Sequence, residues 1–403
     1  MSLDLPATMR QLEAVAERLR QGLAEYMARL DALAAFARTL PLEALRRAAQ
    51  ESPRRLPFLP AEPLDPLPSA YDPPSLPYPW RALATDGSHI DLNRHLPLRC
   101  YLINIGRVAI TYGAEEPPLL ESTPHLFADS ADLHLYDIAT RKTIVVEGAL
   151  VTLYRSGLEV QALASLVQRC TPPYPTVGLV DGSLVLWAPE GGQWPEVVRQ
   201  RFVRAVFLQG LETLRLQAGR FPLAVGGYIS LPNSAEVINT LRLALCTSPP
   251  GECPSLVAPE REPTCPCAVA RGFTDRDLFR RLLEPGQRSG LFRSLSVLVR
   301  EEYGANQAIY FFYLHAGPEV VRVEMPAWCA RQPMLVGLLH ASLLEQVRRG
   351  DGYPLVLQEA HEQAVISSAD REAFRLLVEE SLAQRHLPVY TSEKQRSKRL
   401  RSL

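Results

Sequence analysis

Two copies of the tripeptide Asp-Gly-Ser, each following an apolar stretch, constrain the fold of this chain more than any other feature. One begins at Asp86, and the other begins at Asp181, about a hundred residues later. An apolar strand that ends in Asp and turns through glycine holds the carboxylate rigidly at the edge of a sheet. Two such strand ends predict oxygen ligands that converge on hard divalent cations. Each tripeptide taken alone is also typical of a tight Asp-Gly turn.

Length, composition and net charge limit the possible architectures and binding partners of the chain. A chain of 403 residues with 47% hydrophobic residues can bury a large core, as one elaborated domain or as two to three smaller ones. Its net charge of -1 gives no overall basic surface for nucleic acid, so any positive charge that binds DNA must be local. No apolar stretch is long enough to cross a bilayer and the N-terminus has no signal-peptide pattern, which predicts a cytoplasmic protein.

The cysteines do not form an obvious framework. There are seven, an odd number, which argues against a set of disulfides. Four of them lie in a segment rich in proline and cysteine, residues 246–270: Cys246, Cys253, Cys265 and Cys267. Their spacing does not match the paired Cys-x2-Cys zinc pattern. A structural zinc site and a variable loop without metal both remain open.

The pattern of apolar residues divides the chain into four regions. Residues 1–50 predict a helical hairpin that packs on its own domain or on a second subunit, because their apolar positions recur at three- and four-residue steps. Residues 51–80 form a proline-rich strap that is unsuited to helix or central strand. Residues 81–390 predict one α/β domain that carries the 246–270 insertion, and 391–403 are a basic tail.

Within the large domain the predicted elements change from antiparallel to alternating. A strand at 101–112, or two strands broken at Gly106, a loop carrying Glu115, Glu116 and Glu121, and a strand near 133–138 indicate a meander beside Asp86. Helix and strand then alternate, which is typical of parallel α/β units and predicts a mixed sheet flanked by helices. The remaining predicted elements are helices at 147–169, 195–218, 234–245, 275–283, 333–349 and 368–384, and strands at 223–230, 308–315 and 320–326.

Further candidate site residues lie on these elements. Glu159 is inside the 147–169 helix, and Glu147 competes with it nearer the helix start, although both also suit a solvated surface. Glu324 at a strand end is either a ligand or a surface acid. Tyr353 and His361, eight residues apart, are candidates near the C-terminus, where a lone histidine is more often structural than catalytic.

The order of these features resembles the NurA nuclease family over roughly residues 80–380. The resemblance is carried by both Asp-Gly-Ser tripeptides, the helix with Glu159, the strand end at 227–232, and 352–361 with Tyr353 and His361. It implies a ribonuclease H-like core, a homodimer and manganese-dependent exo- or endonuclease action on DNA ends. It also implies a partner, the hexameric DNA translocase HerA, and a role in DNA end resection during double-strand break repair.

Carried over by position, the resemblance makes five residues catalytic candidates. Asp86 and Asp181 match the two strand-end metal aspartates of the family, and Glu159 matches its helix glutamate, with Glu147 reached by a modest shift. Tyr353 and His361 match the C-terminal pair. A basic residue expected at 232–234 is missing, which bears on how DNA is gripped and leaves the metal site unaffected.

Phosphodiester hydrolysis needs such residues because the phosphate is anionic. Two Mn²⁺ or Mg²⁺ ions would neutralise charge on the attacking, equatorial and leaving oxygens, and the carboxylates that hold them would repel one another without metal. We expect the ions to be held by Asp86, Glu159, Asp181 and His361. His361 also serves as a proton shuttle, and Tyr353 orients the phosphate or stacks on a base.

Two other functions compete with the nuclease. In an ATP-handling enzyme the Asp-Gly-Ser turns would cradle phosphates, but the chain has no Gly-x4-Gly-Lys-Ser/Thr loop. In a catalytically inactive ribonuclease H-like subunit that docks on a translocase, the acids would bind no metal.

Overall fold

The computed structural model describes residues 4–51, 58–91, 98–171, 173–189, 192–246 and 265–386. The chain folds into two compact units, and each is formed from several separate segments. The first unit consists of residues 1–72, 230–296 and 310–323, and the second consists of 73–229, 297–309 and 324–403. The basic tail at 391–403 and most of the cysteine-rich insertion lie outside the described residues.

Five strands form the sheet of the second unit, in the order β9-β8-β3-β4-β5. An antiparallel meander comes first, formed by β3 (Trp80–Ile90), β4 (Tyr101–Tyr112) and β5 (Leu119–Phe127). β8 (Thr176–Asp181) and β9 (Leu223–Ile229) then extend the sheet in parallel with β3. The predicted α/β class, a mixed sheet flanked by helices, is confirmed.

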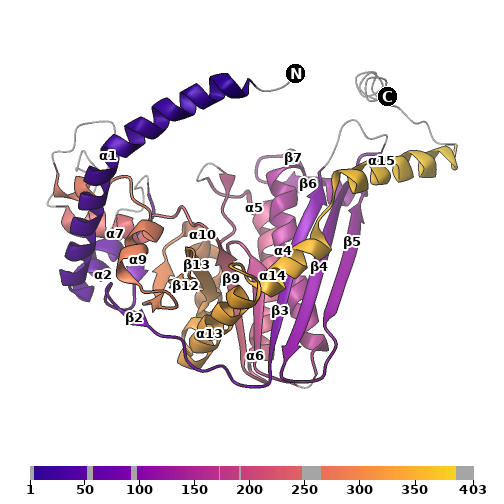
Figure 1. The fold of residues 1–403 in the computed structure, drawn as a ribbon. Helices are drawn as coiled ribbons and strands as arrows, with labels where there is room; N and C mark the ends of the chain where they lie inside the picture. The colour runs from indigo at the N-terminus through magenta and orange to yellow at the C-terminus, as the bar shows by residue number, and fades with distance from the viewer. Residues whose placement is uncertain are drawn as a thin grey trace. The chain divides into compact units, whose positions relative to one another are not determined.

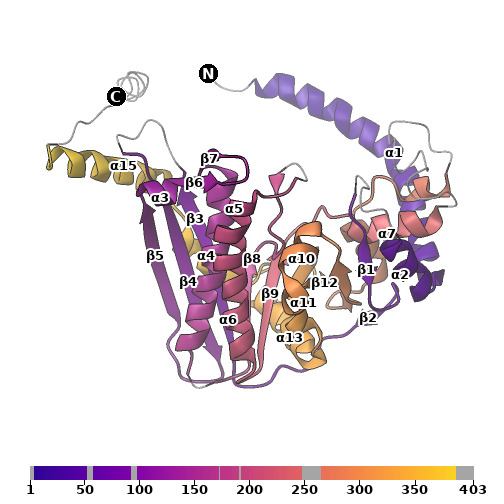
Figure 2. The ribbon, with the colours of Figure 1, turned by 180° about the vertical axis from the view of Figure 1, so that it is seen from behind.

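Helices cover both faces of this sheet, as Figures 1 and 2 show from opposite sides. α4 (Ala149–Arg169) and α6 (Gln209–Ala218) lie on one face, and α13 (Pro333–Arg349) and α14 (Leu355–Ala364) lie on the other. Because both faces are covered, β8 and β9 are almost continuous buried apolar runs rather than alternating ones. The other helices of this unit are α3 (Ser130–Leu133), α5 (Glu196–Val198), the π-helical η2 (Arg199–Leu208), α10 (Val297–Glu302), α11 (Gly304–Gln307), α12 (Ala327–Ala330) and α15 (Ser368–Ala383).

The meander differs from its prediction in two places. The segment assigned to a loop with Glu115, Glu116 and Glu121 contains β5, the outermost strand of the unit, whose Pro124 is tolerated because an edge strand has unpaired backbone groups. The strand predicted near 133–138 is β6 (His134–Asp137), which pairs with β7 (Lys142–Val145) in a separate two-stranded sheet.

Gly106 does not break β4, which runs through it, and its role is to admit α14. A Cβ atom at Gly106 would lie 2.3 Å from the backbone oxygen of Ala360 and 2.8 Å from the nitrogen of Ala364. The Ser88 hydroxyl and the Asn104 side-chain amide donate to the Ala364 oxygen at 2.5 and 2.9 Å. The helix that carries His361 is therefore held close to the sheet.

The first unit has its own core. Its elements are α1 (Leu5–Thr39), α2 (Leu42–Gln50), β1 (Ala61–Pro63), β2 (Ala70–Tyr71), α7 (Glu236–Leu245), η3 (Pro266–Ala270), α9 (Asp275–Leu282), β10 (Arg288–Ser289), β11 (Phe292–Ser294) and most of β12 (Ile309–His315) and β13 (Val320–Pro326). Phe279 stacks on Tyr313 in this core, and the Tyr313 hydroxyl donates to the buried Asp275. Among the described residues, every helix is too short or too polar to cross a bilayer.

We predict that Gly106→Ala destabilises the second unit by about 1–3 kcal/mol, because the new methyl group forces α14 away from β4. All four tryptophans, Trp80, Trp187, Trp194 and Trp328, belong to this unit, so urea unfolding followed by tryptophan fluorescence reports on it. The control is Gly219→Ala at the end of α6 in the same unit, where φ is -74° and a Cβ atom would lie no closer than 3.4 Å to its neighbours, so the same assay should show little loss. Equal unfolding midpoints for both variants would contradict the packing role of Gly106.

Candidate metal centre

Asp86 and Asp181 occupy neighbouring positions on adjacent parallel strands. The register pairs Thr85 with Val180, so the next residues along β3 and β8 are the two aspartates, on strands about 4.8 Å apart. Asp181 ends β8, and Gly182 turns the chain with a φ of 108°. The prediction that Asp86 lies at a strand end is wrong. β3 continues to Ile90 because it pairs with β4 along this length. The first Asp-Gly-Ser is therefore strand rather than turn.

Side chains alternate along β3, so Asp86 and Gly87 face opposite sides of the sheet. Asp86 faces α14, where His361 Nδ1 donates to its Oδ2 at 2.9 Å. Gly87 faces α4, and a Cβ atom there would lie 2.6 Å from Oε1 of Glu159. The missing side chain of Gly87 thus leaves the space through which Glu159 approaches the aspartates from the other face.

α4 holds Glu159 in place through its backbone and through Arg155. The Thr85 hydroxyl donates to the Glu159 backbone oxygen at 2.9 Å, which fixes the helix against β3. Arg155, one turn earlier, donates to the Gly87 oxygen at 2.8 Å and places its Nε 3.3 Å from Oε1 of Glu159. Across the described part of the chain, this buried Oε1 has no hydrogen-bond donor.

The surroundings of Glu159 disfavour the ionised form of its carboxyl group. It is 5% exposed, and loss of hydration raises its pKa to about 8, against the partial compensation of Arg155 and with added repulsion from Asp86 and Asp181. Burial of its carboxylate among protein atoms also raises the pKa of Asp181, although the residue as a whole remains open to solvent. These shifts show three acidic groups close enough to repel one another.

Tyr353 and His361, the two C-terminal candidates, lie against the two aspartates. Tyr353 hydrogen-bonds to Asp181, and burial together with the Asp181 charge raises the pKa of this tyrosine, which keeps it a donor. Its ring meets Tyr228 of β9 edge-on, with centroids 5.4 Å apart. His361 is different because its side chain is 59% exposed, so it stands at the solvent-facing mouth of the group.

Glu324 fixes the turn that follows Asp181. It is 1% exposed and accepts hydrogen bonds from the Ser183 hydroxyl at 2.8 Å and the Leu184 amide at 2.7 Å. The prediction that Glu324 is a surface acid is therefore wrong. Glu324 supports the second Asp-Gly-Ser turn from within the protein.

A cavity of about 550 Å³ opens beside Glu159 and Asp181. Its lining includes Trp194, whose indole donates to the Leu186 oxygen at 2.9 Å, and Trp187, which is 49% exposed. An aromatic ring that stands exposed next to an acidic group is a surface on which a planar base can stack.

The structure brings all five predicted residues, Asp86, Glu159, Asp181, Tyr353 and His361, into one group within the second unit. Glu147 is not in it, because it is exposed and precedes the first residue of α4. The contacts of Gly87 and Arg155 with Glu159 were not predicted from the sequence. The signal for Arg155 was its four-residue spacing from Glu159, which places both on one helix face.

The donor set fits divalent metal ions. Carboxylate oxygens are the ligands of Mg²⁺ and Mn²⁺, and a buried oxygen without a donor, beside two more acids, is the state that a cation would relieve. The ligand atoms of the three acids do not all lie within 4.8 Å of one another, in contrast to a cluster of three cysteines in the first unit.

The second unit is thus an α/β fold that gathers acids from β3, α4 and β8, and the sequence comparison specifies the family. The NurA domain family model matches residues 81–366, so the chain belongs to the NurA nuclease family. No curated protein matches the sequence.

Two solved structures align with parts of the chain. The NurA nuclease from Sulfolobus solfataricus aligns over 78% of this chain and 87% of its own, with 15% identity and a TM-score of 0.45. LC9-RNase H1, a type 1 RNase H with the type 2 active-site motif, aligns over 41% of this chain and 69% of its own, with 8% identity and a TM-score of 0.20.

The raised pKa of Glu159 predicts a pH-dependent stability in protein stripped of divalent cations by a chelator. The folded state retains a proton that the unfolded state loses near pH 4.5, so the free energy of unfolding should fall as the pH rises from about 4.5 through about 8. Glu159→Gln carries no titrating group there and should lose much of this slope, whereas Glu147→Gln should keep it. Parallel curves for the wild type and Glu159→Gln, measured by thermal melts across this range, would contradict the assignment.

Proposed function

We propose that this protein is a metal-dependent DNA nuclease that hydrolyses phosphodiester bonds at the group formed by Asp86, Glu159 and Asp181. The observation that carries the proposal is the buried carboxylate of Glu159, which is repelled by Asp86 and Asp181 and is only partly compensated by its ion pair with Arg155. A cluster of this kind is unfavourable in isolation and becomes favourable when it binds cations. Membership of the NurA family supports the same activity.

Asp86, Glu159 and Asp181 would hold the ions, with His361 beside Asp86 as a further ligand. We propose two Mn²⁺ ions, or Mg²⁺ in their place. Bound divalent ions supply charge neutralisation for the phosphate and for the leaving oxygen. Arg155 limits the repulsion within the group, because its guanidinium lies against Glu159 and is fixed by the Gly87 carbonyl.

The remaining residues position groups and move protons. His361 is exposed and held through Nδ1 by Asp86, so its Nε2 faces outward and is suited to accept or donate a proton at the mouth of the site. Tyr353 orients Asp181 through its hydroxyl, which differs from the sequence-based expectation that it contacts the phosphate or a base. Stacking on a base is better suited to Trp187, which is exposed at the neighbouring cavity.

The two competing functions lose support from particular contacts. A phosphate cradle needs a loop with free backbone amides, but Gly87 lies within β3 and its amide donates to Asp86 at 2.7 Å. An inactive docking subunit would have no reason to keep an acid buried beside two others, since replacing it with an apolar residue removes the repulsion.

Other attributes rest on the family resemblance. We propose exo- or endonuclease action on DNA ends, in end resection and double-strand break repair, with a HerA-type hexameric ATPase as partner and a cytoplasmic location. Purified chain with and without such a partner, assayed on end-labelled DNA, tests the partnership directly.

We also propose a homodimer formed through α1. Only the C-terminal part of this helix is buried in its own unit, by residues such as Leu30 and Leu33. Along its first 23 residues an apolar stripe at three- and four-residue steps stays exposed: Leu5, Met9, Leu12, Val15, Leu19, Leu23 and Met27. Two copies of such a stripe are complementary across a two-fold axis, as in a coiled coil.

We predict that Asp86→Ala and Glu159→Gln lower manganese-dependent cleavage of end-labelled DNA by at least about 100-fold, because each removes a ligand that holds charge against the phosphate. Glu147→Gln is the matched control and should cleave like the wild type. Circular dichroism checks the fold of each variant, and calorimetric titration with Mn²⁺ should show lost or weakened binding for the first two. Wild-type cleavage by folded Asp86→Ala would refute the proposed site.

For the dimer, we predict that the double variant Leu12→Glu and Leu19→Glu shifts the protein to monomers, because four charges would face one another across the stripe. Light scattering after size exclusion measures the mass. Arg18→Glu adds an acid next to the stripe and should leave the dimer intact. A wild-type monomer at micromolar concentration would rule out this interface.

A further inference from the structure

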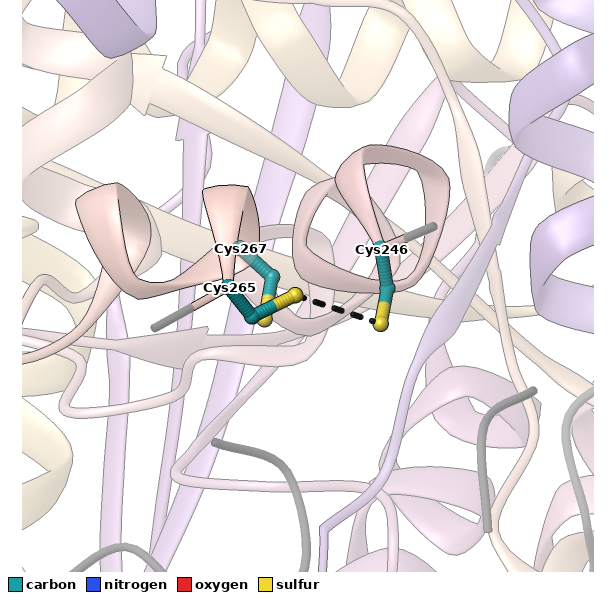
Figure 3. Close-up of side chains that lie close together, drawn as sticks. All are labelled: Cys246, Cys265 and Cys267. Atoms are coloured by element: carbon teal, nitrogen blue, oxygen red, sulfur yellow. Dashed lines mark hydrogen bonds between the residues drawn. The ribbon is translucent and has the colours of Figure 1, made fainter. Parts of the chain in front are cut away.

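Three cysteines gather in the first unit at the two ends of the segment 247–264, which lies outside the described residues. Cys246 follows the last residue of α7, Cys265 precedes η3, and Cys267 lies within η3. Their sulfur atoms all lie within 4.8 Å of one another, and those of Cys246 and Cys265 are 3.6 Å apart. Figure 3 shows the three side chains, with a dashed line between the sulfurs of Cys246 and Cys265. Residues nineteen positions apart in sequence thus present thiols to one point.

The spacing of these sulfurs is that of ligands around a metal ion. Around a tetrahedral Zn²⁺ with Zn–S bonds of about 2.3 Å, neighbouring sulfurs are about 3.8 Å apart, close to the observed Cys246–Cys265 distance. A disulfide needs about 2.05 Å, so the 3.6 Å between the sulfurs of Cys246 and Cys265 is not a disulfide bond. We propose that Cys246, Cys265 and Cys267 supply three of the four ligands of a structural zinc ion.

Local backbone structure directs the thiols to this point. The extended conformation of Cys246 ends α7, and its amide still donates to the Arg242 oxygen. Pro266 starts η3, and its tight turn closes with the Ala268 amide donating to the Cys265 oxygen at 2.9 Å. This turn places Cys265 and Cys267 together at the start of η3, where both sulfurs lie near that of Cys246.

The surroundings favour a stable and selective site. Cys267 is fully buried against Leu243, and Phe58 and Leu245 pack on the same cluster, so solvent is excluded from one side of the thiols. Thiolate sulfur is a soft donor that selects Zn²⁺ over the hard cations proposed for the carboxylates of the second unit. A zinc ion here would fix the two ends of the 247–264 segment to each other and would stabilise the fold without a part in hydrolysis.

The test is metal content and reconstitution of the full-length chain. Protein expressed with added zinc and dialysed should retain about one Zn²⁺ per chain by elemental analysis. Co²⁺ added to metal-free, reduced protein should give the visible and ultraviolet absorption of a tetrahedral thiolate site. Cys246→Ser and Cys265→Ser, at the two partly exposed positions, should each lower zinc affinity by at least about 10-fold. Cys267 is left unchanged because its full burial makes substitution a risk to folding.

Two further variants make the result specific. Cys170→Ser is the matched control, since Cys170 is a partly buried thiol outside the cluster whose hydrogen bond to the Leu166 oxygen a serine can keep. It should bind zinc like the wild type. Asp86→Ala should also retain the zinc, so failure of the nuclease site and failure of the zinc site are distinguishable. Wild-type protein without stoichiometric zinc or a Co²⁺ spectrum overturns the proposal. Isolation of the chain with Cys246 and Cys265 joined as a disulfide in place of bound zinc also overturns it, as does unchanged affinity in both serine variants.

Discussion

The candidate site depends on one unfavourable arrangement, the burial of the Glu159 carboxylate beside Asp86 and Asp181. Loss of hydration and repulsion both oppose its charge, and Arg155 compensates only in part. Such a group persists only where the surrounding structure fixes it. Here the Thr85 hydroxyl holds the helix, and the Gly87 carbonyl holds the arginine.

Gly87 connects this arrangement to the sheet. Because it has no side chain, an acid from the α4 face reaches the two acids that belong to the α14 face. Gly106 has the corresponding role on the opposite side, where it lets α14 approach closely and sets His361 against Asp86. Two glycines on neighbouring strands therefore determine how near the groups on the two faces come to each other.

Rigidity and access are divided among the residues of the site. Glu159 and Glu324 are almost completely buried, and Glu324 fixes the turn after Asp181 by accepting two hydrogen bonds. His361 and Trp187 remain exposed, where a substrate can reach them. The first unit has an aromatic core of its own around Phe279 and a separate cysteine cluster.

The sequence by itself determined the apolar runs and helical periods that gave β9, α4 and α13 nearly at their predicted bounds, because such patterns depend on residues two to four positions apart. It also marked the acids, as residues that follow or accompany those runs. Only the tertiary structure decided that Asp86 lies within a strand, since that depends on pairing with β4. Tertiary packing also buries Glu159 and leaves Glu147 exposed, and it brings Cys246 close to Cys265. The sequence did not predict these placements, because contacts between distant residues leave no local pattern.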